Sequence, residues 1–223
     1  TIPESVTSIG ISAFSGCTGL TTFLLPEGLT TIEQSAFSGC ESLISITIPD
    51  RVMSIGESAF NGCESLIGIT LPFTGESRLA SGSRAQFNYI FGSQKLPISL
   101  SEVVLTDSTH IADNAFSGCL NLTNIVLPDT LVEIKSSAFR YCTGLTTLTL
   151  PEGLKSIGDS TFSGCIGLTN ITIPENVTSI GNSAFNYCTG LTSIIIPESV
   201  TSIGDSAFSG CNGLVSITLP EGL

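Results

Sequence analysis

The chain has 223 residues, of which 41% are hydrophobic and 12% charged, so it can bury a continuous core and is not a disordered chain. Its formal net charge of -12, with only 7 Lys and Arg residues, argues against binding to nucleic acid or to anionic membranes. No apolar run approaches the roughly 18 residues that a membrane span requires, and we expect partners among proteins, glycans or cations.

A repeat of 23 residues organises the chain. Neighbouring cysteines are 23 residues apart in every interval except that from Cys63 to Cys119, which is 56 residues long. Each Cys follows a Phe by three residues and precedes a Leu by three, as Cys211 follows Phe208 and precedes Leu214. Such self-similarity is the signature of a solenoid. Because the chain starts and stops within a repeat, we expect it to be a fragment of a longer protein.

The elements follow a fixed order within each repeat. A run such as 191–197 alternates apolar with small polar residues, which predicts a strand, and Pro197 ends it because proline cannot donate to the next ladder hydrogen bond. A second short strand is predicted at 200–204. A helical turn is predicted at 205–211, where Asp205 can cap it.

Stacking these coils pairs strand with strand at about 4.8 Å and aligns each Leu, Ile, Phe and Cys with its copy in the next coil. The predicted fold class is therefore a mainly-β repeat solenoid of about nine coils. It is expected to be a curved right-handed arc of parallel short strands with short helical turns. We expect one such solenoid over residues 1–223, with an irregular insertion at 73–100.

The repeated motif Leu-x-x-Ile-x-Ile-Pro-Glu-x-Val-Thr-Ser-Ile-Gly-x-x-Ala-Phe-x-x-Cys-x-x resembles the BspA-like leucine-rich repeats of bacterial and trichomonad surface proteins. The resemblance covers nearly the whole chain. The irregular segment, with Phe-Asn-Tyr-Ile-Phe-Gly at 87–92, is similar to an insertion in members from gut Firmicutes. The resemblance implies a leucine-rich-repeat stack at the cell surface or secreted, which adheres to host cells, to matrix proteins such as fibronectin and fibrinogen, or to other bacteria.

The cysteine column allows two interpretations. Adjacent coils bring the Cα atoms within disulfide range, and disulfides are common in extracellular proteins. A reduced, structural column is favoured, because every Cys lies between the Phe and Leu columns, where a buried thiol behaves as a small hydrophobe. Zinc is disfavoured, because no Cys has a second Cys two to four residues away.

An acidic residue follows nearly every strand-ending proline. One interpretation is a stripe for divalent cations, since Ca²⁺ prefers carboxylate oxygens. A solvated acidic edge is favoured, because no Asp-rich loop surrounds an ion. This acidic column consists of Glu4, Glu27, Asp50, Asp129, Glu152, Glu175, Glu198 and Glu221.

The outward strand positions form a small, polar and flat face. In leucine-rich repeats the strand face is the usual partner-binding surface, which is an analogy at the level of the fold. The other interpretation is that β-branched Thr simply suits an exposed strand. The candidate partner-binding residues on this face are Thr147, Thr149, Asn170, Thr172, Ser193 and Ile195.

The insertion concentrates basic and aromatic residues on an otherwise acidic chain. Its basic residues are Arg78, Arg84 and Lys95. Such side chains are natural anchors for a partner, and the candidate partner-binding residues here are Arg78, Arg84, Phe87 and Tyr89. The alternative, which is favoured, is that Phe87, Ile90 and Phe91 pack back over the solenoid as an inserted coil.

Enzymatic chemistry is not expected. His110 is the only histidine, and no acid or nucleophile pattern surrounds it, so the sequence contains no recognisable triad. We expect no cofactor and no metal. The predicted function is an adhesion module that binds extracellular or host proteins through its repeat face. A structural spacer and a glycan-binding module are the alternatives, although the absence of Trp removes one common platform for sugars.

Overall fold

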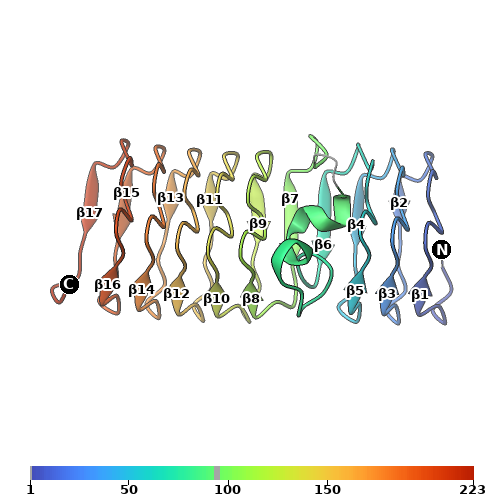
Figure 1. The fold of residues 1–223 in the computed structure, drawn as a ribbon, viewed down its shortest axis with the longest axis horizontal. Helices are drawn as coiled ribbons and strands as arrows, with labels where there is room; N and C mark the ends of the chain where they lie inside the picture. Colours follow the sequence, from blue (N-terminus) through green and yellow to red (C-terminus); the bar gives the residue numbers. More distant parts are fainter. Residues whose placement is uncertain (1, 93–95) are drawn as a thin grey trace. The chain divides into compact units, whose positions relative to one another are not determined.

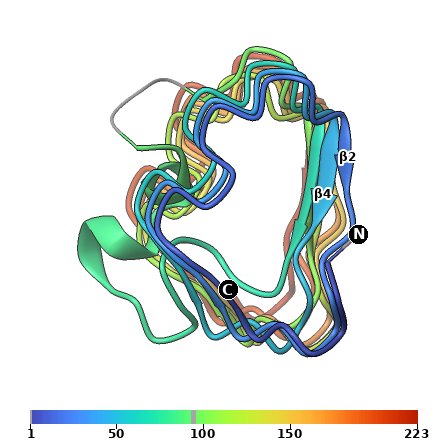
Figure 2. The ribbon, with the colours of Figure 1, turned by 90° about the vertical axis from the view of Figure 1, so that its right-hand side faces the viewer.

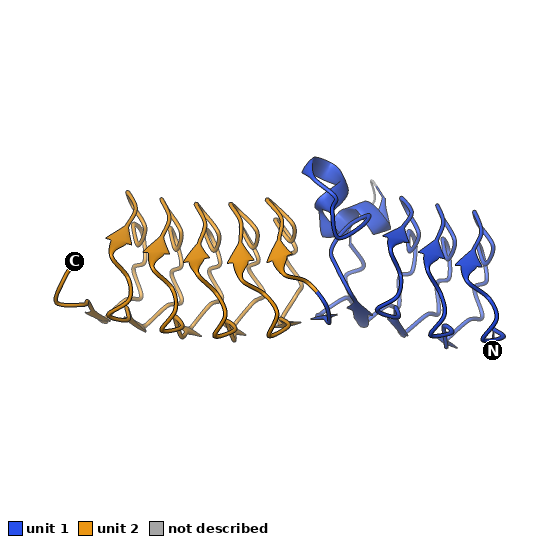
Figure 3. Ribbon diagram, turned by 90° about the horizontal axis from the view of Figure 1, so that it is seen from below, with its two compact units in different colours: residues 1–107 blue, residues 108–223 orange. Residues whose placement is uncertain are grey.

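A computed structural model describes residues 2–92 and 96–223. The chain divides into two compact units, residues 1–107 (unit 1) and residues 108–223 (unit 2), coloured separately in Figure 3. Each unit is a β-solenoid of short parallel strands, which confirms the predicted fold class (Figure 1). Lys95, one of the three basic residues of the insertion, lies outside the described residues.

Unit 1 contains two parallel ladders, one in the order β1-β3-β5 and one that includes β2-β4-β6-β7. Regular neighbours pair one repeat apart, as Ser8 does with Thr31. Gly68 of β6 instead pairs with Glu102 of β7, because the insertion lengthens the coil between them. The strands are β1 (Ser8–Ile9), β2 (Thr22–Phe23), β3 (Thr31–Ile32), β4 (Ser45–Thr47), β5 (Ser54–Ile55), β6 (Gly68–Leu71) and β7 (Glu102–Leu105).

Unit 2 repeats the same plan without interruption. Its shorter strands form the ladder β16-β14-β12-β10-β8, and its longer strands include the pairs β11-β13 and β15-β17. Seen end-on, the longer strands lie along one side of the coil (Figure 2). The strands are β8 (His110–Ile111), β9 (Asn124–Val126), β10 (Glu133–Ile134), β11 (Thr147–Leu148), β12 (Ser156–Ile157), β13 (Asn170–Ile171), β14 (Ser179–Ile180), β15 (Ser193–Ile195), β16 (Ser202–Ile203) and β17 (Ser216–Thr218).

The segment expected to form a helical turn is a series of tight turns. In the last complete repeat, the amides of Ala207, Ser209 and Cys211 each donate to the carbonyl three residues earlier. Ser206 has φ 56°, in the left-handed region, which interrupts any helical run. The carbonyls of this segment also accept hydrogen bonds from the preceding coil, as the Ala207 carbonyl does from the Phe185 amide. Along this segment, amides that donate within their own coil therefore alternate with amides that donate to the next coil, and no continuous helix forms.

Columns of identical side chains make the core. The rings of Phe139 and Phe162 are stacked at 5.5 Å with an interplanar angle of 2°, and both side chains are fully buried. Their offset stacking adds to the free energy of burying two large apolar side chains. The Phe column comprises Phe14, Phe37 and Phe60 in unit 1 and Phe116, Phe139, Phe162, Phe185 and Phe208 in unit 2.

The cysteines are free thiols beside the Phe column. The Cys165 Sγ lies 3.0 Å from the Phe139 carbonyl oxygen of the preceding coil, to which its S–H donates, and most other cysteines make the equivalent bond. Burial raises the pKa of Cys63 and of Cys119 to about 12. Because the thiolate is the nucleophile and the metal ligand, such protonated thiols are suited to packing.

The insertion forms an enlarged coil (Figure 1) with two 3-10 helices, η1 (Gly82–Ala85) and η2 (Phe87–Phe91). The Phe60 amide donates to the Ile90 carbonyl, as the Phe37 amide donates to the Ala59 carbonyl in a regular coil. Phe91 therefore takes the position of the next Phe in the column, with its ring 6.3 Å from that of Phe60. The interpretation of this segment as an inserted coil is confirmed.

Candidate functional site

The strand face of unit 2 presents the six predicted residues to solvent. Each outward residue alternates with a buried one, and Leu148, Ile171 and Ile194 are 3–5% exposed. The alternation follows from the strand period of two, since successive side chains point to opposite faces. The exposed residues, which lie on or directly after β11, β13 and β15, are Thr147, Thr149, Asn170, Thr172, Ser193 and Ile195.

A shallow depression runs between the strands of this face. In unit 2 it is lined by the outward side chains of β11 and β13 together with Glu152 of the acidic column. In unit 1 a depression occupies the equivalent repeat positions, between β2 and β4, with Glu27 in the place of Glu152. The recurrence shows that the repeat itself generates the feature. Hydroxyl, amide and carboxylate groups converge there, and they can hydrogen-bond to an extended partner segment.

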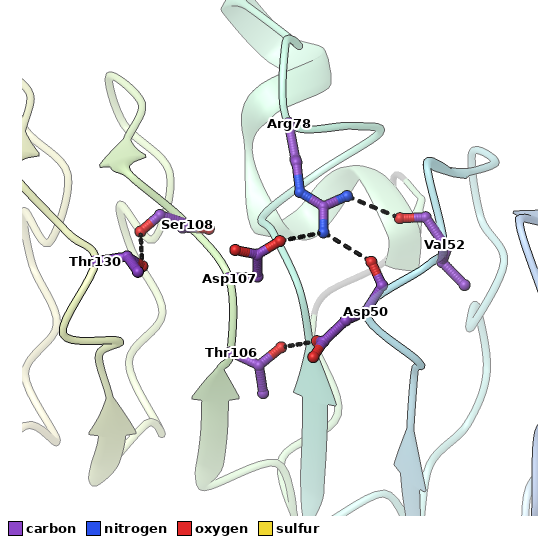
Figure 4. Close-up of polar contacts among 7 residues, drawn as sticks. All are labelled: Asp50, Val52, Arg78, Thr106, Asp107, Ser108 and Thr130. Carbon is purple, nitrogen blue, oxygen red and sulfur yellow. Dashed lines mark hydrogen bonds and ion pairs between the residues drawn. The ribbon is translucent and has the colours of Figure 1, made fainter. Parts of the chain in front are cut away.

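The acidic column is exposed, and its members are not equivalent. The Asp50 carboxylate accepts a hydrogen bond from the hydroxyl of Thr106, the residue directly after β7 (Figure 4). Within residues 2–92 and 96–223, no cluster of three or more His, Cys, Asp or Glu side chains has metal-binding geometry. The column contributes negative charge along the edge of the strand face. The solvated acidic edge stays the favoured interpretation, and the cation stripe stays the alternative hypothesis.

Arg78 connects the insertion to the regular coils of unit 1 (Figure 4). Its guanidinium donates to the carbonyls of Val52 and Asp50 at 3.0 and 2.8 Å and to the Asp107 carboxylate at 2.7 Å. The same group lies 5.2 Å from the centre of the Phe73 ring. Because these contacts use several of the five guanidinium donors, Arg78 has a clear structural role, and any role in partner binding stays a prediction.

Two other predicted anchors in the insertion remain accessible. The Arg84 side chain is 67% exposed and forms a loose ion pair with Glu76 at 3.6 Å. Tyr89 is half-buried, and its pKa is raised by burial first and then by the negative charges of Glu76 and Glu57. Their contribution to binding stays a prediction.

Phe87 was wrongly predicted as a partner-binding residue. It is 0% exposed, because its ring packs inward at 5.2 Å from that of Phe91. The apolar residues that the insertion does expose are Leu79, at 92%, and Ile98, at 87%. Sequence reasoning missed them, because an insertion without a period gives no signal for which apolar residues face outward.

This architecture of parallel strands, strand-ending prolines and Phe and Cys columns defines a leucine-rich-repeat solenoid. The family model described as the BspA type leucine rich repeat region matches residues 1–93 and 109–223, in 6 copies. The chain belongs to this family.

Two solved structures illustrate the likeness. A leucine rich cell surface protein from Faecalibacterium prausnitzii is 34% identical, with a TM-score of 0.53, over 97% of this chain and 58% of its own. A leucine-rich repeat protein from Bacteroides ovatus is 30% identical, with a TM-score of 0.49, over 100% of this chain and 73% of its own. This chain thus spans little more than half the length of the Faecalibacterium protein. A comparison with curated proteins gave no match.

The described residues contain no helix with the length and apolar character needed to cross a bilayer.

Proposed function

We propose that the chain is a cell-surface or secreted interaction module that binds extracellular or host proteins through its strand face. The observation that carries the proposal is the depression, lined by both polar and apolar groups, that recurs at equivalent repeat positions in both units. Membership in a family of leucine-rich repeats, whose fold is typically a non-catalytic binding scaffold, supports it. The cell-surface description of the Faecalibacterium relative supports the location.

The chemistry of the face favours many weak contacts. Thr, Ser and Asn side chains offer hydrogen bonds but little apolar area, so each coil contributes little free energy by itself. A partner that contacts several coils gains avidity, because each further contact is intramolecular. The acidic column favours basic partner segments by charge complementarity. Leu79, Ile98 and Arg84 of the insertion offer exposed anchors that the regular coils lack.

The direct test is biolayer interferometry of the immobilised chain against fibronectin and fibrinogen at physiological salt. Thr149→Arg with Thr172→Arg places two large cations in the unit 2 depression, and we expect binding to weaken by about 10-fold or more. The matched control is Thr178→Arg with Thr201→Arg, which makes the same changes at exposed threonines beside the shorter strands.

The control should bind as the unmodified chain does. No saturable response to either matrix protein, from a chain with unchanged circular dichroism, would contradict the proposal and favour the structural spacer. Equal weakening by both double variants would assign the effect to net charge and would contradict the strand face as the binding surface. Repeating the experiment with a chelator tests separately whether the acidic column uses Ca²⁺.

A further inference from the structure

The residue directly before each repeat Cys lies in the left-handed region of the backbone. In six coils it is glycine, with φ of 73–76°. In unit 2 two coils have tyrosine instead, Tyr141 with φ 60° and Tyr187 with φ 56°. An L side chain in this conformation costs roughly 1–2 kcal/mol. Because two large aromatic residues stand at this strained position, we infer that their rings have a functional role.

The two rings lie against the glycines of the following coils. A Cβ added at Gly164 would be 2.3 Å from Cδ1 of Tyr141, and one added at Gly210 would be 2.7 Å from Cδ1 of Tyr187. Tyrosine and glycine alternate along unit 2, so each ring occupies the space that a side chain in the next coil would need. Tyr141 remains 48% exposed and Tyr187 60% exposed. The backbone thus supports each ring while much of its surface stays accessible.

The separation of the rings follows from the repeat. Phe139, Phe162 and Phe185, which belong to the same three coils, have successive ring distances of 5.5 and 5.3 Å. Tyr141 and Tyr187 are two coils apart, so the ring spacing of the Phe column places them roughly 11 Å apart along the stack. The intervening coil carries Gly164, so no side chain from this repeat position stands between the two rings.

Polar groups flank both rings. The Arg140 guanidinium lies over one face of the Tyr141 ring, 4.8 Å from its centre, and donates to the tyrosine hydroxyl at 3.1 Å. Asn186 occupies the equivalent position before Tyr187 and donates to the Ser209 carbonyl at 3.1 Å. Arg and Asn carry donors in a planar arrangement, which suits paired hydroxyl or carboxylate oxygens.

We propose that Tyr141 and Tyr187 form an aromatic platform on unit 2 that binds a linear glycan lying along the stack. The face of an aromatic ring is electronegative and attracts the C–H groups on the face of a sugar ring. In a linear β-linked glycan, alternate sugars present equivalent faces, so two rings separated by about two sugars engage the same chain twice. Arg140 and Asn186 hydrogen-bond to its oxygens. This activity is additional to protein binding by the strand face and does not depend on it.

A proline-rich peptide is the competing ligand, because extended proline helices also bind aromatic side chains. Such peptides insert into grooves between closely spaced aromatic residues. The glycine coil between the two tyrosines favours a flat ligand instead. The experiment therefore includes decaproline as a probe.

The test is isothermal titration calorimetry with cellohexaose, xylohexaose, chitohexaose and mannohexaose, four linear β-linked hexasaccharides of different substitution. We expect at least one to bind, and to quench the tyrosine emission of this Trp-free chain. Tyr141→Gly with Tyr187→Gly should weaken that binding by about 10-fold or more, since stacking contacts of this kind are each worth about 1–3 kcal/mol. This variant installs the residue that six other coils have, so it should fold.

The matched control is Tyr141→Phe with Tyr187→Phe, which keeps the rings and should keep the binding. Binding of a hexasaccharide that survives the glycine variant would overturn the proposal, as would no binding of any of the four by the folded chain. Binding of decaproline with no response to the sugars would replace the glycan with a proline-rich partner.

Discussion

The two units are built from the same repeat, but only unit 1 contains an enlarged coil. In unit 2 every coil is regular, and Phe139 and Phe162 stack with an interplanar angle of 2°. In unit 1 the enlarged coil brings Phe91 to Phe60 at an interplanar angle of 45°. The backbone bond from the Phe60 amide to the Ile90 carbonyl is nevertheless retained. An inserted coil is tolerated when it preserves the hydrogen bonds between coils, even though the packing of its side chains is less regular.

The glycines before the repeat cysteines show a second difference. In unit 1, a Cβ added at Gly39 would meet only the backbone of Gly16, at an ordinary distance of 3.5 Å. In unit 2, the equivalent Cβ at Gly164 would overlap the Tyr141 ring. The backbone conformation favours glycine at both positions, but only in unit 2 does a neighbouring side chain also require it.

The largest expected effect tests the regularity of the Phe column. Phe162→Ala should destabilise the chain by about 3–5 kcal/mol, because neighbours fixed on both sides prevent the cavity from collapsing. Phe91→Ala should cost less, because the enlarged coil can relax around its tilted ring. Urea unfolding followed by circular dichroism measures both, and hydrogen exchange assigns the change to a unit. Equal losses would show that the insertion is packed as rigidly as unit 2.

The next effect concerns the glycines. Gly39→Ala should cost about 1–2 kcal/mol, for the left-handed backbone alone. Gly164→Ala should cost about 1–3 kcal/mol more, because its Cβ overlaps Tyr141. Urea midpoints give both values. The double variant Tyr141→Gly with Gly164→Ala should recover the additional loss, and additive effects in this cycle would contradict the close contact.

The cysteine column predicts a loss of stability at alkaline pH. The pKa of Cys119 is about 12 in the folded chain, above that of an unfolded thiol, so the folded state holds the proton where the unfolded state has released it. Stability should therefore fall as the pH rises above about 8.5, by up to about 1.4 kcal/mol per pH unit for each such thiol. Urea midpoints in reductant between pH 7 and 10 measure the slope. Cys119→Ala should make it shallower, and an unchanged slope would show that this thiol ionises freely.

The smallest effect separates two arginines of the insertion. Arg78→Met should destabilise the enlarged coil by about 1 kcal/mol, because it removes hydrogen bonds to Asp50, Val52 and Asp107 from a side chain that is only one third exposed. Arg84→Met is the matched control, and its exposed ion pair should contribute almost nothing. Hydrogen exchange of residues 76–92 reports the difference. Equal protection in the two variants would contradict the structural role of Arg78.

Most of the fold could be predicted from the sequence, because a strict period places every residue of a coil once one coil is understood. The strands, the prolines that end them and the Phe and Cys columns followed from spacing alone. The exposure of Thr147, Asn170 and Ser193 followed from the strand alternation. The insertion has no period, so nothing in its sequence indicated that Phe87 faces inward and Leu79 outward.

The sequence by itself determined the coil, its stacking register and the polar character of the strand face, since these depend on local patterns that recur every 23 residues. Only the tertiary structure decided what depends on contacts between coils. It showed that alternate amides of the expected helical turn donate to the next coil, and that Arg78 holds the insertion in place. It also showed that the Tyr141 and Tyr187 rings lie over glycines 23 residues further along the chain. A local pattern does not contain these contacts, because they arise only when separate coils are packed together.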